Sequence, residues 1–347
     1  MKLTDRRISY SEAVELFKKS NLLEIGEIAD GIRKQLHGEG IVTFVIDRNI
    51  NYTNICSCKC KFCGFYRTSG DEDAYVITDE ELFSKIDETI ALDGTQILIQ
   101  GGLNPDLDIT YYENMLRKIK SKYDIWIHGF SPPEIDFISR TSGISLDETI
   151  ERLVKAGLDS IPGGGAELLV DTERVKISPN KINSDGWLDI MRRAHGFGLK
   201  TTATMMFKKT DSVEYIVEHL DKIRRLQDET GGFTAFIPWP FQPYNTELGG
   251  EVVTAVEYLK VLSLSRIYLD NIKNIQVSCV TQGPKIGQMG LYFGGNDFGS
   301  LMIEENVVAS CGASYRMSVE EIVHNIKSAG FTPAQRGMKY NIIRRFD

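Results

Sequence analysis

Short apolar runs alternate with amphipathic stretches along most of the chain, and this alternation limits the folds that the sequence can adopt. The apolar runs have the composition of β-strands, whereas the stretches between them place apolar residues three and four positions apart, as helices do. Strands that alternate with helices form βαβ units around a parallel sheet. We predict eight strands, at Ile41–Asp47, Thr95–Gln100, Ile125–His128, Leu158–Ile161, Thr201–Phe207, Phe233–Ile237, Ile275–Val280 and Leu291–Phe293.

Eight strands of this kind predict an α/β fold of the (β/α)8 TIM-barrel type. An open, doubly wound sheet is the alternative, although no GxGxxG follows the first strand, as its dinucleotide-binding form would require. Three regions are expected: an N-terminal helical extension at residues 1–40, the barrel at residues 41–330, and a C-terminal tail at residues 331–347 packed on the barrel. The predicted helices are Ser11–Ser20, Leu23–Leu36, Thr78–Leu92, Thr110–Lys120, Leu146–Lys155, Asp185–Phe197, Ser212–Glu229, Thr254–Leu269 and Val319–Ser328, with room for only a short helix between Val280 and Leu291.

Glycine- and proline-rich segments follow most of the predicted strands. They are GGLNP (101–105), GFSPPE (129–134), PGGGAE (162–167), PWPFQPYN (238–245), TQGPK (281–285) and GGNDFG (294–299). Single segments of this kind often only end a strand. Six of them at the same end of successive strands instead predict one shared site, because glycine lets the backbone approach a ligand closely. The active site is therefore expected at the carboxyl ends of the strands.

The composition of the chain limits the kinds of binding partner and the cellular compartment that are expected. The formal net charge is −8, and without a basic block this argues against binding to nucleic acid or to a membrane surface. Hydrophobic residues make up 42% and charged residues 25% of the chain, as in globular proteins. The N-terminal residues lack the apolar run of a signal peptide, and no stretch approaches a membrane span. A cytoplasmic protein is expected.

Four of the six cysteines lie within eight residues of one another, at positions 56, 58, 60 and 63. Clustered thiols in a cytosolic chain favour metal binding over disulfides. Cys56, Cys60 and Cys63 could hold three irons of a [4Fe–4S] cluster and leave the fourth iron open to a small chelating molecule. A structural zinc site is the alternative, but it needs four ligands, usually from two paired CxxC units, and no second pair is present. The isolated Cys279 and Cys311 are interpreted as buried thiols without metal.

The spacing Cys-x3-Cys-x2-Cys, with Phe62 between the second and third cysteines, resembles that of the radical S-adenosylmethionine (SAM) superfamily. This resemblance implies a [4Fe–4S] cluster that binds SAM and cleaves it to a 5′-deoxyadenosyl radical. It also implies that Phe62 packs near the adenine and that Gly101 and Gly102 meet the methionine amino group. Glu167 is similar to an acidic residue that contacts SAM, and a carboxylate that favours a helix start is its alternative role.

Further strings resemble one group within this superfamily. They are IHGFSPPEI (127–135), GLDSIPGGGAELLVD (157–171), ISPNK (177–181), TTATMMF (201–207), LQDETGGFTAFIPWPFQP (226–243) and GNDFGS (295–300). The group contains aminofutalosine synthases, deazaflavin-forming proteins and cyclic dehypoxanthine futalosine synthases, and the strings are most similar to the last. The resemblance covers nearly the whole chain from about residue 43. Cys58 is a departure from the group's pattern, and its role stays open.

The resemblance implies an enzyme of menaquinone biosynthesis. Hydrogen abstraction from the ribose C4′ of dehypoxanthine futalosine would start a radical cyclisation onto the arene, with flavodoxin or ferredoxin as the expected type of electron donor. The neighbouring enzymes of the group, or a zinc-stapled binding protein without turnover, are the alternatives. An assay with each candidate substrate would distinguish the neighbouring enzymes. A reconstituted iron–sulfur cluster that cleaves SAM would exclude the zinc-stapled binding protein.

The remaining candidate residues are assigned to the substrate. His128 is our first choice for the base that removes the arene proton, and Asp297 is the second. His128 could instead only position the substrate, and Asp297 could be a turn residue. Arg67 is a candidate clamp for the substrate carboxylate, unless it lies at the surface. Candidate partners of the ribose oxygens are Tyr66, Thr204, Gln242, Asn245 and Asn296.

Overall fold

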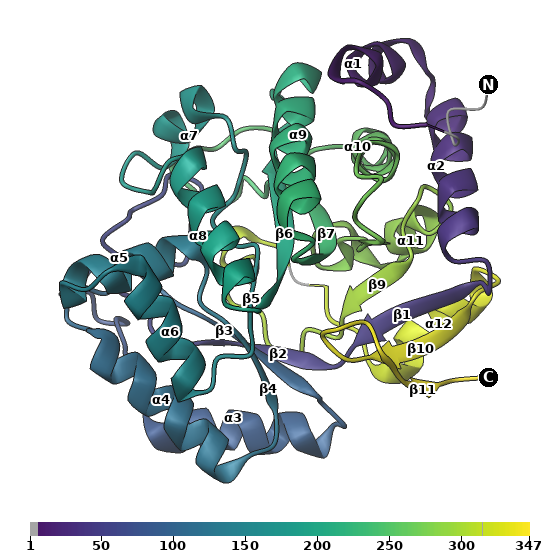
Figure 1. The fold of residues 1–347 in the computed structure, drawn as a ribbon. Coiled ribbons are helices and arrows are strands. Elements are labelled where there is room, and N and C mark those ends of the chain that lie inside the picture. Colours follow the sequence, from purple (N-terminus) through teal and green to yellow (C-terminus); the bar gives the residue numbers. More distant parts are fainter. Residues whose placement is uncertain (1–5, 314) are drawn as a thin grey trace.

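Parallel strands form the centre of the protein in the computed structural model, which describes residues 6–313 and 315–347. Seven of them make one sheet in sequence order from β2 to β8, and helices cover its outer face (Figure 1). The strands are β2 (Asp47–Asn51), β3 (Gln96–Gln100), β4 (Trp126–Gly129), β5 (Ser160–Ile161), β6 (Lys200–Phe207), β7 (Phe233–Pro240) and β8 (Asn274–Ile275). Strands that pair in the order of the chain with helices between them are built from repeated βαβ units.

A second sheet closes this curved sheet into a barrel. Strand β1 (Ile41–Val45) runs directly into β2 and pairs in parallel with β9 (Asp297–Ser300). A parallel bridge between Gln276 and Asp297 joins β9 to the strand end beyond β8. With β1 and β2 counted as one bent strand, eight parallel strands surround the interior. The predicted (β/α)8 barrel is confirmed.

The prediction of the eighth strand at Leu291–Phe293 was wrong. These residues form a turn after α11 (Cys279–Gly290), and Leu291 and Phe293 are buried in the core. The eighth strand is β9, which the sequence analysis had taken as the glycine-rich segment that follows a strand. Its composition, DFGS, hides a strand because two of its residues are polar and Gly299 has a φ of +87°. The apolar run was therefore core packing rather than a β signal.

The predicted helices are confirmed, with ends that shift by a few residues. Their observed bounds are α1 Tyr10–Lys19, α2 Leu22–Leu36, α3 Asp79–Ala91, α4 Ile109–Lys122, α6 Leu146–Ala156, α8 Ser184–Gly196, α9 Val213–Thr230, α10 Ala255–Tyr268 and α12 Val319–Ser328. Two helices were missed, α5 (Pro132–Ser142) and α7 (Asp171–Ile177), together with the short 3₁₀ turn Ala309–Cys311. Helix α5 lies in a segment that looked like a loop because of its prolines, but proline is well tolerated in the first helical turn. The described residues contain no helix with both the length and the apolar character needed to cross a membrane.

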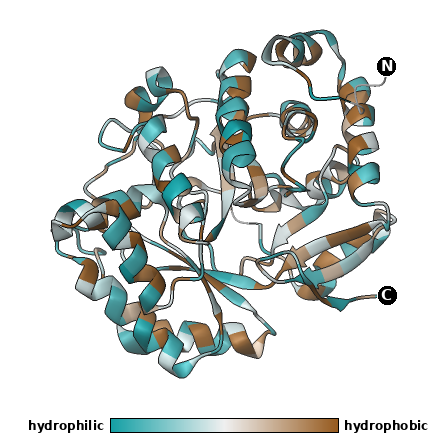
Figure 2. Cartoon of the chain, in the orientation of Figure 1, coloured by the Kyte–Doolittle hydropathy of each residue, from teal (hydrophilic) through white to brown (hydrophobic). Residues whose placement is uncertain are grey.

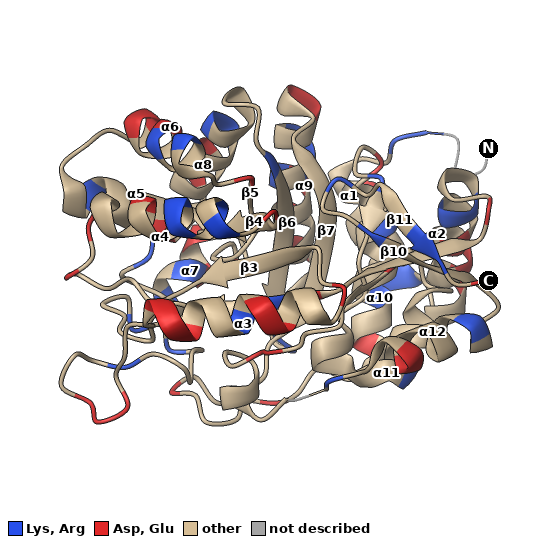
Figure 3. Cartoon of the chain, turned by 90° about the horizontal axis from the view of Figure 1, so that it is seen from below, with Lys and Arg blue, Asp and Glu red and all other residues tan. Residues whose placement is uncertain are grey.

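The strands are largely free of charge, whereas the helices carry most of the charged residues. In Figure 3 the acidic and basic residues gather on helices such as α3 and α6, while β3, β4 and β7 have none. Figure 2 shows the complementary pattern, with hydrophobic residues along strands and on one side of many helices. This is the distribution expected when one face of each helix packs on the sheet and the other meets water.

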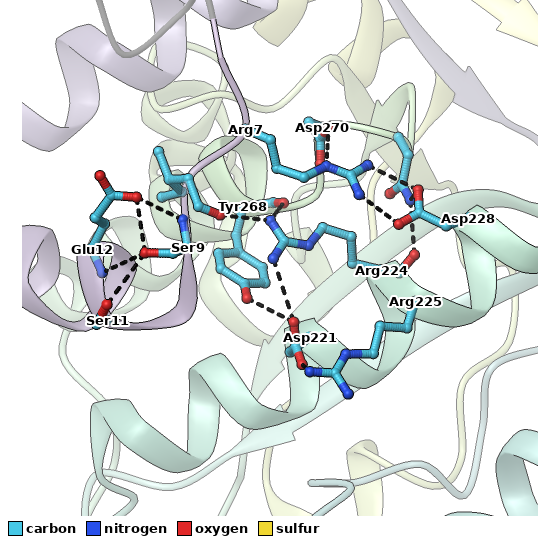
Figure 4. A network of polar contacts seen from close by, with 12 residues as sticks. Arg7, Ser9, Ser11, Glu12, Asp221, Arg224, Arg225, Asp228, Tyr268 and Asp270 are labelled. Carbon is cyan, nitrogen blue, oxygen red and sulfur yellow. Dashed lines mark hydrogen bonds and ion pairs between the residues drawn. The ribbon is translucent and has the colours of Figure 1, made fainter.

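The N-terminal extension packs against the outside of the barrel, on α9 and α10 (Figure 1). Its first five residues lie outside the described part of the chain. Arg7 binds Asp228 and Asp270, and Arg224 of α9 donates to the carbonyl oxygen of Ile8 at 2.9 Å (Figure 4). These polar contacts add to the apolar contacts of Ile8, Ala13, Ile25 and Ala29, which belong to the hydrophobic core.

The C-terminal tail extends the second sheet. Strand β10 (Thr332–Arg336) pairs in parallel with β1, from Ile41 opposite Thr332 to Phe44 opposite Gln335. Strand β11 (Ile342–Arg345) pairs with β10 in the antiparallel direction. The tail thereby places the buried Arg336 at the wall of the barrel interior.

Candidate active site

A cavity of about 300 Å³ occupies the inside of the barrel. Alternate residues of the strands line it, because successive side chains of a strand point to opposite faces. Asp47 and Gln96, near the amino ends of β2 and β3, form its floor, and Thr204 and Trp239 stand near the carboxyl ends of β6 and β7. Residues Gly163–Gly165, which follow β5, contribute backbone at the mouth. The cavity thus runs from the predicted rim down to the floor.

The cysteine loop follows β2, at the mouth of the barrel. The backbone N–H of Cys56 donates to the carbonyl oxygen of Arg67 at 3.0 Å, and that of Cys63 donates to the carbonyl oxygen of Cys60 at 3.1 Å. Four cysteines and Phe62 pack with Leu103 and Phe137. The sulfurs of Cys58 and Cys60 are 3.4 Å apart, and the Cys58 thiol lowers the pKa of Cys60 to about 7. Within the described residues, no three His, Cys, Asp or Glu side chains lie close enough together to hold a single metal ion.

Gly101 and Gly102 lie against this loop. A Cβ atom at Gly102 would come within 2.1 Å of the carbonyl oxygen of Ile55, and one at Gly101 would come within 2.6 Å of the Tyr52 ring. Only glycine permits the end of β3 to approach the cysteine loop this closely. The Gly102 backbone therefore packs directly on the segment that carries Cys56. Three thiols on this loop are the type of donor that binds iron in iron–sulfur clusters.

Glu167 is a buried carboxylate beside the cysteine loop. Its Oε1 is 2.9 Å from Nζ of Lys181, and its Oε2 is 3.4 Å from Nη1 of Arg174. Its backbone has a φ of +38°, which is uncommon for a residue with a side chain. Lys181 also lies 5.0 Å from the centre of the Phe62 ring. The structure therefore brings together Phe62, Glu167 and the cysteine loop, and it adds Lys181.

His128 lines the cavity in its neutral form. Burial, reinforced by the charge of Arg336, lowers its pKa to about 3. Ser160 Oγ accepts a hydrogen bond of 2.7 Å from Trp126 Nε1 and lies 2.7 Å from His128 Nδ1. An imidazole with a pKa this far below its ordinary value is a weak base, which counts against our interpretation of His128 as the base.

Asp297 and Asn296 lie away from the rim on which the sequence analysis placed them. Asp297 Oδ2 accepts from Thr43 Oγ1 at 2.6 Å and binds Arg336, so its carboxylate is occupied. Asn296 Oδ1 accepts from Arg266 Nη2 at 2.6 Å beneath the barrel. The placement was wrong because it depended on a strand at Leu291–Phe293. With β9 as the eighth strand, both residues lie at its amino end.

The other predicted substrate residues are spread over the rim. Arg67 pairs with Asp73 at 2.7 Å and donates to the carbonyl oxygen of Tyr66 at 3.0 Å, so its guanidinium holds its own loop. Thr204 lines the cavity, and its Oγ1 donates to the carbonyl oxygen of Gly163 at 2.6 Å. Tyr66 is half-buried near the mouth. Gln242 lines a smaller pocket of about 40 Å³ beside Phe62, and the Asn245 amide donates to the carbonyl oxygen of Ser310 at 3.1 Å.

Sequence reasoning missed several polar residues of the cavity wall. Asp47, Gln96 and Tyr340 line it, as does Arg336, the one Lys or Arg side chain among the described lining residues. One signal was present in the sequence: polar residues at alternate positions of buried strands, as in Asp47-x-Asn49. No comparable pattern marked the tail.

Comparisons with known proteins agree with this geometry. The profile of the radical SAM superfamily matches residues 50–223, and the profile of the CofH/MqnC C-terminal region matches residues 230–346. A barrel with three thiols on the loop after its first bent strand is the arrangement of a radical SAM enzyme, and the chain belongs to this superfamily. Enzymes of the superfamily use a [4Fe–4S] cluster and SAM.

Within the superfamily, the chain groups with cyclic dehypoxanthine futalosine synthases. The protein of this name from Halalkalibacterium halodurans is 46% identical over 98% of this chain and 93% of its own length. The one from Streptomyces coelicolor is 42% identical over 96% of this chain and 85% of its own. The 5-amino-6-(D-ribitylamino)uracil–L-tyrosine 4-hydroxyphenyl transferase from Methanococcus aeolicus is 40% identical over 97% of both chains.

Solved structures support the fold. Methylornithine synthase has a TM-score of 0.75 at 17% identity and covers 96% of both chains. The FeFe-hydrogenase maturase HydG from Carboxydothermus hydrogenoformans has a TM-score of 0.75 at 17% identity and covers 98% of this chain and 79% of its own. At this identity the likeness concerns the barrel alone.

Proposed function

We propose that the protein converts dehypoxanthine futalosine to cyclic dehypoxanthine futalosine. The observation that supports this substrate most is the 46% identity, over nearly the full length of both chains, to a protein named for that reaction. A cavity inside the barrel suits it, because a carbon radical must be kept from water and from stray hydrogen donors.

Cys56, Cys60 and Cys63 would hold the cluster. The Gly101–Gly102 backbone, Phe62 and Glu167 are the proposed contacts of SAM, since they surround the same space at the mouth of the barrel. When bound, the cluster and SAM supply an electron and a 5′-deoxyadenosyl radical. Lys181 lies between Glu167 and the Phe62 ring. It therefore places a buried cation beside the residues that are proposed to contact SAM, which itself carries an anionic carboxylate.

The substrate would lie below this point, in the 300 Å³ cavity. Abstraction of the C4′ hydrogen leaves a carbon radical that adds to the arene of the same molecule, so proximity supplies much of the rate. Loss of one proton to a base, and of one electron to an acceptor such as the oxidised cluster, would then restore aromaticity. The neutral imidazole of His128 lines the cavity and is suited to form a hydrogen bond with a polar group of the substrate.

Asp47 is the proposed proton acceptor. Three carboxylates line the cavity among the described residues, and two of them are more fully engaged than Asp47: Glu167 pairs with Lys181, and Glu305 accepts three backbone N–H groups, those of Val307, Val308 and Ala309. Asp47 accepts only from neutral groups, at 2.7 Å from Gln96 Nε2 and from the Ser300 hydroxyl. Burial raises the pKa of Asp47, which makes its carboxylate a stronger base.

A second candidate function is transfer of a 4-hydroxyphenyl group from tyrosine to 5-amino-6-(D-ribitylamino)uracil. The 40% identity to the archaeal transferase favours it, over 97% of both chains. Both functions would begin with a radical in the same barrel. They differ in the acceptor, so the substrate decides between them.

An anaerobic assay tests the proposal. The reconstituted protein receives SAM, a reductant and either dehypoxanthine futalosine or tyrosine with the ribityl uracil. We expect 5′-deoxyadenosine and the cyclised product in equal amounts from the first mixture, with deuterium transfer from substrate deuterated at C4′. Cys60→Ser should abolish both products, whereas Cys58→Ser, on the same loop, should retain them. Product from the second mixture alone would overturn the proposal in favour of the transferase.

A further inference from the structure

One cationic side chain reaches the floor of the cavity, and it comes from the C-terminal tail. Arg336, the last residue of β10, is 3% exposed and lines the cavity. It is the one Lys or Arg side chain among the described lining residues. The candidate clamp of the sequence analysis, Arg67, is bound to Asp73 in its own loop. An anionic substrate group inside the barrel would therefore meet Arg336.

The guanidinium of Arg336 is oriented by its neighbours and has donors to spare. The Nε and Nη2 groups of Arg336 donate to the Asp297 carboxylate, with 3.2 Å between Nη2 and Oδ1. The Thr43 hydroxyl donates to the same carboxylate at 2.6 Å. The Tyr340 ring lies 4.2 Å from Cζ. Nη1 has one long contact, 3.4 Å from the carbonyl oxygen of Gly337. The Nη1–Nη2 end can thus still donate two parallel hydrogen bonds, the geometry that fits a carboxylate.

Unpaired polar atoms occur on the same wall. The Tyr340 hydroxyl, Gln96 Oε1 and Asn49 Oδ1 are buried atoms with no hydrogen-bond partner among the described residues. All three residues line the cavity with Arg336. Of these three atoms, the Tyr340 hydroxyl is a donor that a carboxylate at this end would pair with. The two amide oxygens are acceptors, and they would pair with an N–H or O–H group.

We propose that Arg336 and Tyr340 form the subsite that binds the aromatic carboxylate of the substrate. The assignment rests on the proposed function, because dehypoxanthine futalosine carries a benzoate at one end and a ribose at the other. With the carboxylate at the floor, the ribose extends toward Gly163–Gly165 and the proposed SAM contacts at the mouth. Asp297 is a positioning residue that fixes the guanidinium. The subsite selects substrates with an anionic aromatic end.

Titration calorimetry on the cluster-free protein tests the subsite. It compares the affinity for dehypoxanthine futalosine with the affinity for the analogue in which a carboxamide replaces the carboxylate. The unmodified protein should bind the carboxylate at least about 100-fold more tightly, as expected for a buried charge-assisted pair. Arg336→Lys should reduce this preference at least tenfold, and Tyr340→Phe should weaken carboxylate binding a few-fold. Arg345→Gln removes an exposed arginine from β11 of the same tail and should change nothing.

Loss of folding is separable from loss of binding. Arg336→Gln alone would leave the Asp297 carboxylate buried without its cation. It is therefore combined with Asp297→Asn, so that the double variant lacks both charges. If this double variant folds and still prefers the carboxylate, or if the unmodified protein shows no preference, the subsite is overturned. Should the double variant not fold, Arg336→Lys and Tyr340→Phe decide.

Failure of the proposed function gives a different result. In that case the unmodified protein forms no cyclised product in the anaerobic assay. The subsite is then judged with a fragment, 3-acetylbenzoate against 3-acetylbenzamide, in the same variants. Tighter binding of the benzoate that is lost in Arg336→Lys supports the subsite, and equal binding of the two fragments overturns it.

Discussion

Asp47 is a buried carboxylate whose hydrogen-bond partners, Gln96 and Ser300, are both neutral. Among the described residues that line the cavity it contrasts with Glu167, which is paired with Lys181. A buried carboxylate with a raised pKa and no cation bound directly to it is a competent proton acceptor. At the scale of single residues, the proposed reaction therefore depends on Asp47 for its last step rather than on His128 or Asp297.

Asp47→Asn tests this assignment. The replacement fits, because the unpaired Oε1 of Gln96 can accept from the new amide after a flip of the Gln96 side chain. We expect cyclised product to form at least about 100-fold more slowly, the usual size of a general-base effect. Formation of 5′-deoxyadenosine and deuterium transfer from C4′ should persist, since they precede proton loss. An unchanged ratio of cyclised product to 5′-deoxyadenosine, measured by chromatography, would contradict the role.

His219 gives a prediction for stability against pH. It is fully buried, its Nδ1 accepts from the Leu169 N–H at 3.0 Å, and burial lowers its pKa to about 3. The folded state therefore holds this imidazole neutral, while the unfolded chain protonates it below a pKa of about 6.5. Its contribution is complete above pH 6.5 and is lost as the pH falls toward 3.

His219→Gln should flatten this dependence. For each pH unit below about 6.5, the free energy of unfolding of the unmodified protein should fall by about 1.4 kcal/mol more than that of the variant. The reason is that His219 binds a proton in the unfolded chain but not in the folded state. Urea unfolding at pH 7 and pH 5 measures the difference. His324→Gln, at an exposed site of α12, is the matched control and should leave the pH dependence as it is. Parallel curves for His219→Gln and the unmodified protein would count against a neutral buried imidazole.

At the scale of elements, the start of helix α5 couples a cap to the glycine turn. Glu134 Oε2 accepts the Ser131 N–H at 2.7 Å, which completes a capping box. Its Oε1 accepts the Tyr52 hydroxyl at 2.8 Å and the Gly101 N–H at 3.0 Å. One buried carboxylate thus fixes both the helix and the backbone proposed to meet SAM.

Glu134→Gln should destabilise the fold by about 1–3 kcal/mol, because an amide N–H₂ would face donors in place of one oxygen. Binding of SAM should weaken as well, since Gly101 loses an acceptor that orients it. Glu81→Gln in the capping box of α3 is the matched control: its site is exposed, so the loss should stay below about 1 kcal/mol. Guanidinium unfolding compares the two. Equal losses would show that the link to Gly101 adds nothing.

The helices and strands of the barrel show how much of the fold the sequence could predict. Periodicity identified the helices of the barrel and most of its strands, because packing on a single sheet imposes a regular apolar pattern. It missed α5, whose prolines looked like a loop, and β9, whose residues are polar because Asp297 binds Arg336. The cysteine loop and Phe62 were visible from spacing. Arg336 was not, since a contact between β9 and the tail leaves no local pattern.

At the scale of the whole molecule, buried apolar residues such as Ile25 and Ala29 join the N-terminal extension to the core, and charged pairs lie around them at the surface. Arg7 pairs with Asp228 and Asp270, and the Arg7 side chain is 43% exposed. Arg224, which donates to Ile8, is buried instead. Exposed pairs contribute little because solvent and salt screen them.

Arg7→Gln should therefore lower the free energy of unfolding by less than about 1 kcal/mol and leave turnover unchanged. The loss should shrink further in 1 M salt, where charges are screened within about 3 Å. Arg224→Gln should cost more, because it leaves the Ile8 carbonyl without its donor. Thermal unfolding at two ionic strengths measures both variants. A salt-independent loss in Arg7→Gln would assign packing, rather than charge, to this residue.

The pairing of β1 with β10 has a consequence for how the protein is made. Ile41 pairs with Thr332, which lies nearly three hundred residues further along the chain, so this edge of β1 has no partner strand until β10 has been synthesised. Pairings this distant form late and leave nascent chains prone to association. Arg336 enters the barrel wall together with β10. The proposed substrate pocket is therefore incomplete in any nascent chain that does not yet contain β10.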